Sequence, residues 1–443
     1  PAGGDADCGS ILDPAHLSSG LKLAGIWGMS DNMIALARAS LLSTHGFIAG
    51  NLRWLGVGFV LFFLSSLGQT YFIGLSIGDI RQEFDLSHGD IGLLNMVLTL
   101  LSGVAVFATG KWSDQLSPRK LIAILLPVLA VGAVLFQSLV SLQVFLLGLL
   151  ILRIFAQGFL THIAFVVVGR WFNARRGMAI AVTSIGQNIG QMLLPVSFVA
   201  LSALIGWRTS WIVIAVILLL LTPFLMRLAS SERTAEVEAD SAHAGEPDKS
   251  VRSLTRAEVL RRPEFHAYVF AILPMALVAN TIFFHQVHLT ETRGWGLDAF
   301  TASYSVMAVS TILAGFGAGW LVDRFSAVAL LPYYLIPLLV ACLLLAVSTA
   351  PWIMVPFMAL VGISNGFSLN LYGAVWAEAF GTDHLGAIRS VVTMIVIFAA
   401  AVGPGAAGVL LDMGFGFGTI YFLLSALCTI ASAVVWPFTH RAQ

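Results

Sequence analysis

One arginine of this chain stands deep inside a long apolar stretch. Arg153 lies in the run 142–169, and Gln157 and Thr161 follow it four and eight residues later, on the same face of a helix. A guanidinium in hydrocarbon costs about 3 kcal/mol or more, so it must face water, a partner or other helices. Two interpretations stay open: Arg153 binds a carboxylate through a bidentate contact, or it is structural, bonded to backbone carbonyls and glutamine side chains.

Other polar side chains also fall near the middle of apolar runs, when each residue is given about 1.5 Å of helix. They come from both halves of the chain. Those of the first and seventh runs lie at matching depths, as do those of the fourth and tenth, which one central cavity would require. The residues that we predict for this cavity are Gln69, Tyr71, Arg153, Gln157, Gln187, Gln191, Asn280, His285, Asn365 and Tyr372.

Acidic residues are absent from the middle of these runs, so Arg153 has no obvious counter-charge. If protons are carried, His285 or His162 could carry them, because the unperturbed pKa of histidine is near 6.5. A lone histidine in an apolar helix is more often a hydrogen-bonded structural residue, and that alternative stays open here.

The elements that hold these side chains are apolar runs of membrane-spanning length. The chain is 58% hydrophobic and 10% charged, whereas soluble domains carry roughly 25% charged residues. A spanning segment needs about 20 apolar residues and must be helical, because hydrocarbon offers the backbone no hydrogen-bond partners. We predict an all-α integral membrane protein with twelve transmembrane helices near 54–78, 91–112, 120–140, 142–169, 177–205, 208–227, 266–290, 299–322, 327–349, 351–377, 388–411 and 418–438.

The segment 229–263 is rich in charged residues and separates two sets of six runs. We therefore predict two six-helix bundles, 51–228 and 264–440, joined by a cytoplasmic linker with a short surface helix at 253–261. Residues 1–50 are mixed in composition and read as a poorly ordered or surface-lying lead. With both termini in the cytoplasm, 19 of the 23 lysines and arginines fall on the cytoplasmic side.

A short polar loop occurs twice, about half a chain apart. Its first copy contains Gly110, Asp114, Arg119 and Lys120, and its second contains Gly319, Asp323 and Arg324. The aspartates are 323 − 114 = 209 residues apart, and other pairs, such as Gln157-Gly158-Phe159 with Asn365-Gly366-Phe367, recur at nearly the same spacing. The repeat indicates that the two halves are copies of one design.

Several classes of function are excluded by composition and motif. The formal net charge is zero, which gives no indication of a nucleic-acid partner. Three cysteines suggest no disulfide framework, and no cluster has the spacing of metal ligands. No ATP-binding motif is present, so we do not expect ATP to drive the protein directly. We predict neither an enzyme nor a cofactor.

The repeated loop resembles that of the major facilitator superfamily of secondary transporters, which reads G-x-x-x-D-R-x-G-R-R/K-R/K. Gln115, Ser117 and Pro118 depart from that pattern. The fourth helix is similar to the family's arginine followed by a Gln-Gly step, at Arg153 and Gln157-Gly158. The fifth carries Gly186, Gly190 and Pro195, a loosened form of the Gly/Pro-rich signature, and Gly403-Pro404 lies in the eleventh. The resemblance covers roughly residues 50–440.

Within the superfamily, the loop at 170–177 and the polar first helix look most like the bacterial branch near the monocarboxylate and oxalate–formate carriers. The acidic first-helix signature of the classical monocarboxylate carriers is missing. The resemblance implies a secondary transporter that moves a small organic anion, such as a monocarboxylate, by alternating access with proton symport or solute exchange. An exporter of hydrophobic compounds is the alternative, and a non-transporting membrane sensor is a third possibility.

The resemblance also implies the cellular location, the partners and the residues that gate transport. We expect a monomer in the bilayer of a bacterial cytoplasmic membrane, with a small-molecule substrate and a coupling ion as its partners. The aspartates could lock one state of the cycle against a helix N-terminus or a basic residue, although simple positive-inside loop chemistry is the alternative. The gating residues that we predict are Gly110, Asp114, Arg119, Lys120, Gly319, Asp323, Arg324 and Arg389.

Overall fold

The computed structural model describes residues 46–109, 116–138, 140–172, 176–230, 254–381 and 383–439. The chain divides into two units, Pro1–Gly56 and Val57–Gln443. Most of the lead predicted at 1–50 lies outside the described residues, and 46–50 are helical. All packing described below is within Val57–Gln443.

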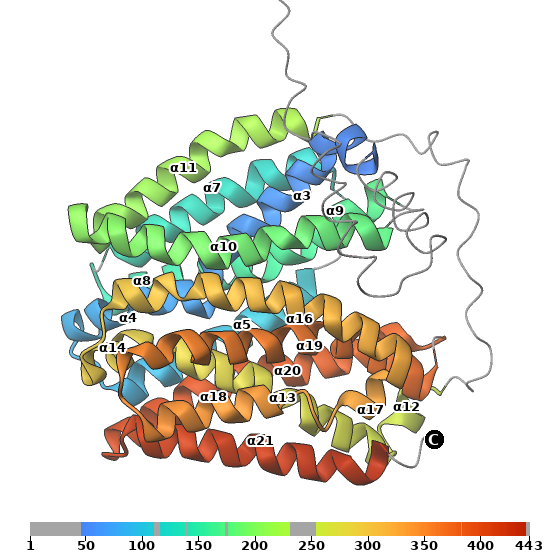
Figure 1. Ribbon diagram of the computed structural model, residues 1–443. Helices are drawn as coiled ribbons and strands as arrows, with labels where there is room; N and C mark the ends of the chain where they lie inside the picture. The colour runs from blue at the N-terminus through green and yellow to red at the C-terminus, as the bar shows by residue number, and fades with distance from the viewer. Residues whose placement is uncertain are drawn as a thin grey trace, which may run out of the picture. The chain divides into compact units, whose positions relative to one another are not determined.

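Every regular element of the described residues is helical (Figure 1). The helices of the first half are α3 (Leu52–Ser65), η1 (Ser66–Gly68), α4 (Thr70–Glu83), α5 (His88–Thr109), α7 (Pro118–Gln137), α8 (Leu142–Ile151), η2 (Leu152–Leu160), α9 (Thr161–Trp171), α10 (Arg176–Ile205) and α11 (Trp207–Leu228). The helices of the second half are α12 (Arg256–Val259), α13 (Pro263–Phe284), α14 (Gln286–Arg293), α15 (Leu297–Ala302), α16 (Tyr304–Phe325), α17 (Ala327–Leu330), α18 (Ile336–Val347), η4 (Pro351–Ile353), α19 (Met354–Phe380), α20 (Leu385–Asp412) and α21 (Phe417–Thr439).

Eleven segments of the described chain are long and apolar enough to cross a membrane. They correspond to eleven of the twelve predicted runs. The remaining run, 327–349, is divided into α17 and the 12-residue α18. Two prolines explain this division: Pro332 and Pro337 each lack a backbone N–H and clash with the carbonyl four residues earlier, so one continuous helix cannot form.

The surface helix expected at 253–261 is present as the single turn α12. The Thr255 side chain accepts from the Glu258 backbone N–H, and the Glu258 side chain accepts from the Thr255 backbone N–H. This capping box satisfies two free donors at the start of the helix. The rest of the predicted linker, from 231 to 253, lies outside the described residues.

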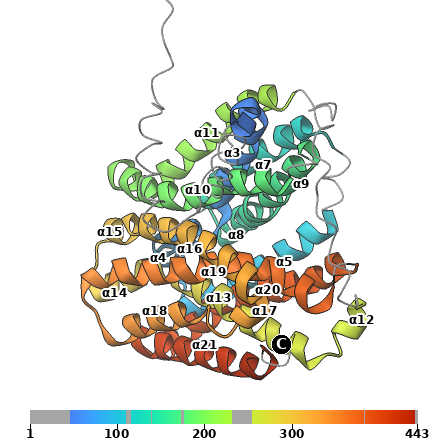
Figure 2. The ribbon, with the colours of Figure 1, turned by 45° about the vertical axis from the view of Figure 1, so that its right-hand side comes forward.

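Helix contacts repeat between the two halves of the chain. Helix α7 packs on α11 and α18 packs on α21, and in both views the two helices of each pair lie side by side (Figures 1 and 2). Helix α5 contacts η2 in the first half, and α16 contacts α19 in the second. Each pair joins the corresponding spans of its half, so the sequence repeat is also a repeat of packing.

Three sets of contacts join the halves: α5 with α20, α4 with α13 and α14, and α10 with α15 and α16. Helices α5 and α20 approach closely at glycines. A Cβ on Gly408 would lie 2.2 Å from the carbonyl oxygen of His88, which is far inside van der Waals contact. The small residue at this position therefore permits the two helices to touch backbone to backbone.

The first and fourth spans both depart from regular α-helix where they cross. The first span changes to the short 3-10 turn η1 and then to extended backbone at Gln69. The fourth contains the π-helix η2. A Cβ on Gly68 would lie 2.5 Å from the backbone nitrogen of Gln157, so only glycine allows this crossing. Irregular helix of this kind often marks a functional position.

Candidate functional site

Arg153 lies on η2 and is fully buried at this crossing. One terminal nitrogen, Nη1, donates to the Gly68 carbonyl at 3.2 Å and to the Gln157 side-chain oxygen at 2.9 Å. The other, Nη2, donates to Asn95 Oδ1 on α5 at 2.6 Å. The carbonyl of Gly68 lies where the first span is interrupted, so the guanidinium satisfies backbone that the broken helix leaves free.

Thr70, the first residue of α4, connects the arginine to the second half of the chain. Its Oγ1 accepts from Arg153 Nη1 at 3.1 Å and donates to Asn280 Oδ1 on α13 at 2.5 Å. Asn280 Nδ2 donates in turn to the Ala276 carbonyl at 2.8 Å. We call Arg153, Thr70 and Asn280 the arginine relay; it crosses from the first half to the second.

A cavity of about 110 Å³ lies beside the relay. One water needs roughly 10–15 Å³ of such space, so a small organic solute fits. Its lining combines amides and hydroxyls with aliphatic, thioether and aromatic groups. The lining residues are Gln69, Thr70, Tyr71, Gln191, Met275, Ala279, Asn280, Phe283, Met307, Val361 and Asn365.

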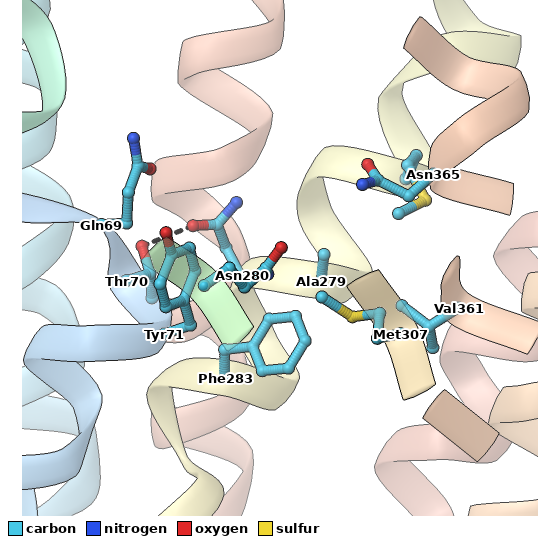
Figure 3. Close-up of a pocket in the computed structure, with 11 residues that line it drawn as sticks. Gln69, Thr70, Tyr71, Ala279, Asn280, Phe283, Met307, Val361 and Asn365 are labelled. Atoms are coloured by element: carbon cyan, nitrogen blue, oxygen red, sulfur yellow. Dashed lines mark hydrogen bonds between the residues drawn. The ribbon is translucent and has the colours of Figure 1, made fainter. Parts of the chain in front are cut away.

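Figure 3 shows how the labelled lining residues lie around the cavity. Thr70 and Tyr71 face Asn280 across the junction of α4 and α13, and Met307 and Val361 lie on the opposite side. No residue of this lining carries a charge. The cation of Arg153 is separated from the cavity by the hydroxyl of Thr70, to which it donates. The site can therefore offer hydrogen bonds and apolar contact to one solute.

Five of the ten residues predicted for the cavity line it. They are Gln69, Tyr71, Gln191, Asn280 and Asn365. They come from the first, fifth, seventh and tenth spans, so the lining is drawn from both halves of the chain.

The other five predicted residues lie outside this lining, although their spans contribute to it or adjoin it. Arg153 and Gln157 bond to each other behind Thr70. Gln187 is one turn before Gln191 on α10, and it does not line the cavity. His285 is buried, with Nε2 2.9 Å from the Pro404 carbonyl oxygen.

Tyr372 lies further along α19 than the cavity residue Asn365, toward the end of the molecule that carries Arg389. Its hydroxyl bonds to Thr393 Oγ1 on α20 at 2.5 Å. The guanidinium of Arg389 stands over the tyrosine ring, 5.7 Å from its centroid. This cluster joins α19 to α20 and is separate from the cavity lining.

The predicted gating residues are only partly described. Gly110 and Asp114 lie outside the described residues. Arg119 and Lys120 are exposed in the first turn of α7. The second copy of the loop forms the last two turns of α16, which contain Gly319, Asp323 and Arg324. The guanidinium carbon of Arg324 lies 5.5 Å from the centroid of the Trp320 ring. The gating role stays a prediction.

Sequence reasoning missed Thr70 and Asn95, which hold the arginine. Both are short polar residues inside apolar runs, and that was the only signal. It also missed Glu378, whose carboxylate accepts from the Ala327 backbone N–H at 2.7 Å and so begins helix α17. Each of these side chains acts on an element far from it in sequence.

A second contact between the halves was also missed. The Asp412 carboxylate, at the end of α20, accepts from the backbone N–H of His88 at 3.0 Å and of Gly89 at 2.7 Å, at the start of α5. The ring of His88 lies 4.0 Å from that of His288 on α14, centroid to centroid. We call this end of the helix bundle the Asp412 end.

Taken together, the fold and the cavity define a class of protein: a multi-pass membrane protein whose polar cavity lies where two repeated sets of helices meet. The family model of the Major Facilitator Superfamily matches residues 58–395. The chain belongs to this superfamily of transporters.

Two similar proteins and one solved structure illustrate the range of its relatives. Membrane sensor protein UhpC of Escherichia coli (strain K12) is 24% identical over 410 residues, which is 87% of this chain and 90% of that protein. Monocarboxylate transporter 12 of Rattus norvegicus is 25% identical over 316 residues, 63% of each protein. The crystal structure of nucleoside transporter NupG superimposes with a TM-score of 0.62 at 16% identity, over 87% of this chain and 98% of that one; this likeness concerns the fold alone.

Proposed function

We propose that this protein is a secondary active transporter, and not an enzyme, that moves a small organic anion such as a monocarboxylate by alternating access. The observation that carries the proposal is the cavity beside the arginine relay. Its lining has hydrogen-bonding groups and no carboxylate, and the cation of Arg153 lies one hydroxyl behind it. A positive potential without a counter-charge favours a negative solute over a cation.

The apolar part of the lining supports the same class of solute. Met275, Phe283, Met307 and Val361 offer contact to a short hydrocarbon group. A monocarboxylate has one charged end and one apolar end, so it matches a lining that offers both hydrogen bonds and apolar contact. The similarity to a monocarboxylate transporter is consistent with this choice.

We further propose that the protein is a monomer in a bacterial cytoplasmic membrane with both termini in the cytoplasm. The distribution of lysine and arginine supports this orientation, which places Arg81, Arg208 and Arg293 on the outer side. The Asp412 end is then external, and the bonds of Asp412 to His88 and Gly89 join the two halves on that side.

Purified protein in liposomes tests the proposal. We expect saturable uptake of radiolabelled lactate or formate, and competition by unlabelled carboxylate. Gln69→Leu, in the cavity, should lower uptake, whereas Gln143→Leu, an exposed residue of α8, should leave it unchanged. Uptake that is insensitive to both substitutions would contradict the assignment of the cavity.

The second candidate function is a membrane sensor, favoured by the similarity to UhpC. Thermal unfolding with added solute separates the candidates. A sensor would be stabilised by carboxylates and yet transport none of them. Stabilisation by the lipophilic cation tetraphenylphosphonium, and not by carboxylates, would instead indicate an exporter of hydrophobic compounds.

A further inference from the structure

The hydroxyl of Thr70 has a hydrogen-bond direction that its neighbours determine completely. A guanidinium has only donors, so Arg153 must donate to Thr70 Oγ1. The Ala276 carbonyl has only acceptor capacity, so Asn280 must turn its Nδ2 toward that carbonyl and its Oδ1 toward Thr70. The single proton of Thr70 therefore points at Asn280 Oδ1.

This arrangement makes Thr70 an unusually strong donor. The cation of Arg153 withdraws electron density from the Thr70 oxygen and so makes the hydroxyl proton more positive. Hydrogen bonds in such chains strengthen one another. Thr70 is only 6% exposed, and Arg153 is fully buried, so little solvent weakens the effect. A strong donor prefers an anionic acceptor to the neutral amide oxygen that it meets in this structure.

A solute in the cavity can compete for that donor, because Thr70 and Asn280 both line it (Figure 3). A carboxylate oxygen that accepts from Thr70 replaces Asn280 Oδ1 in the bond. The displaced bond is one that joins α4 of the first half to α13 of the second. Binding of an anion would thus remove a contact between the halves, whereas an ammonium group could not, since it has no acceptor.

We propose that Thr70 determines specificity for carboxylates over neutral solutes, and that the solute carboxylate takes the place of Asn280 as the acceptor of the Thr70 hydroxyl. The inference rests on the proposed transport of an organic anion and assigns the group that recognises its charge. Arg153 acts through Thr70 as a positioning residue, without touching the solute.

Binding of lactate and of its neutral analogue lactamide to the purified full-length protein tests this role. Wild-type protein should bind lactate more tightly than lactamide. Thr70→Val keeps the side-chain shape and removes the hydroxyl, so it should weaken lactate binding about tenfold or more and change lactamide binding much less. Thr70→Ser, which keeps the hydroxyl, should restore the preference.

Thr183→Val is the matched control. Thr183 is also buried, but its hydroxyl bonds to the Ala179 carbonyl of its own helix α10 at 2.8 Å, outside the cavity lining. This variant should keep the preference for lactate. A Thr70→Val variant that is folded and still prefers lactate by the wild-type ratio would overturn the role of Thr70 and leave anion transport standing. Absence of lactate binding and uptake by wild-type protein would overturn both.

Discussion

Replacing Arg153 tests whether its hydrogen bonds stabilise the fold or whether the residue matters only when a solute is bound. Its guanidinium holds four acceptors: Gly68 O, Thr70 Oγ1, Asn95 Oδ1 and Gln157 Oε1. Gly68 O, Thr70 Oγ1 and Gln157 Oε1 share the two N–H groups of Nη1, and Asn95 Oδ1 meets Nη2 on the other arm of the guanidinium. A lysine carries all its donors on one nitrogen and cannot reach both arms, so Arg153→Lys leaves at least one acceptor unpaired. A glutamine is shorter and has one amide nitrogen, so Arg153→Gln leaves about two unpaired.

These counts set the expected loss of stability. Each buried polar group left without a partner costs about 1–3 kcal/mol. We therefore expect Arg153→Lys to lower the free energy of unfolding by about 1–3 kcal/mol, and Arg153→Gln by about 2–6 kcal/mol. Both losses should appear in the absence of any solute, since the acceptors belong to the protein.

The assay is thermal unfolding of the detergent-purified variants without added ligand. The control is Arg208→Gln, because Arg208 pairs with Glu83 at 3.1 Å while its side chain is 47% exposed. An exposed pair of this kind is worth about 0–1 kcal/mol. If Arg153→Gln unfolds at the same temperature as Arg208→Gln, the four hydrogen bonds do not stabilise the fold and the structural reasoning is wrong.

Three further predictions concern other contacts. Gly408→Ala should separate α5 from α20 at the Asp412 end, because its Cβ would lie 2.2 Å from the His88 carbonyl oxygen. Distances between spin labels placed on α5 and α20 at this end should therefore lengthen. The control is Gly317→Ala, whose Cβ would have no neighbour within 4 Å and which should leave these distances unchanged. Glu378→Gln should weaken the cap of α17 and cost about 1 kcal/mol in thermal unfolding; an unchanged midpoint would argue against the cap. Burial lowers the pKa of His288, which lies beyond the end of span α13. The packed imidazole binds protons less readily than a hydrated one, so stability should be full above the ordinary pKa near 6.5 and fall as the pH drops through the lowered value. A scan of melting temperature against pH should show this fall, and His288→Asn should reduce it.

Much of the architecture could be predicted from composition alone. Apolar runs of about 20 residues must become helices in a bilayer, whatever surrounds them. The repeat of Asp114 at Asp323 indicated two related halves before any packing was known. Hydropathy did not predict the division of the run 327–349, because it treats as continuous a segment that Pro332 and Pro337 divide.

The site was harder to predict, because its contacts join residues that are distant in sequence. Arg153 stood out by its charge, but its partners Gly68 and Asn95 are 85 and 58 residues away. Depth in a helix selected Gln69, Asn280 and Asn365 for the cavity, while the rotation of each helix about its axis decided which polar side chains face it. That rotation depends on packing against neighbouring spans, and a single sequence does not contain it.

The sequence by itself determined that this chain crosses a membrane as two repeated sets of helices with one buried cation, since burial of charge and backbone in hydrocarbon leaves few alternatives. Only the tertiary structure decided that the cation stands behind the cavity wall and reaches it through Thr70. The reason is physical: hydrogen bonds depend on distances of about 3 Å, and only packing brings α4, η2 and α13 that close.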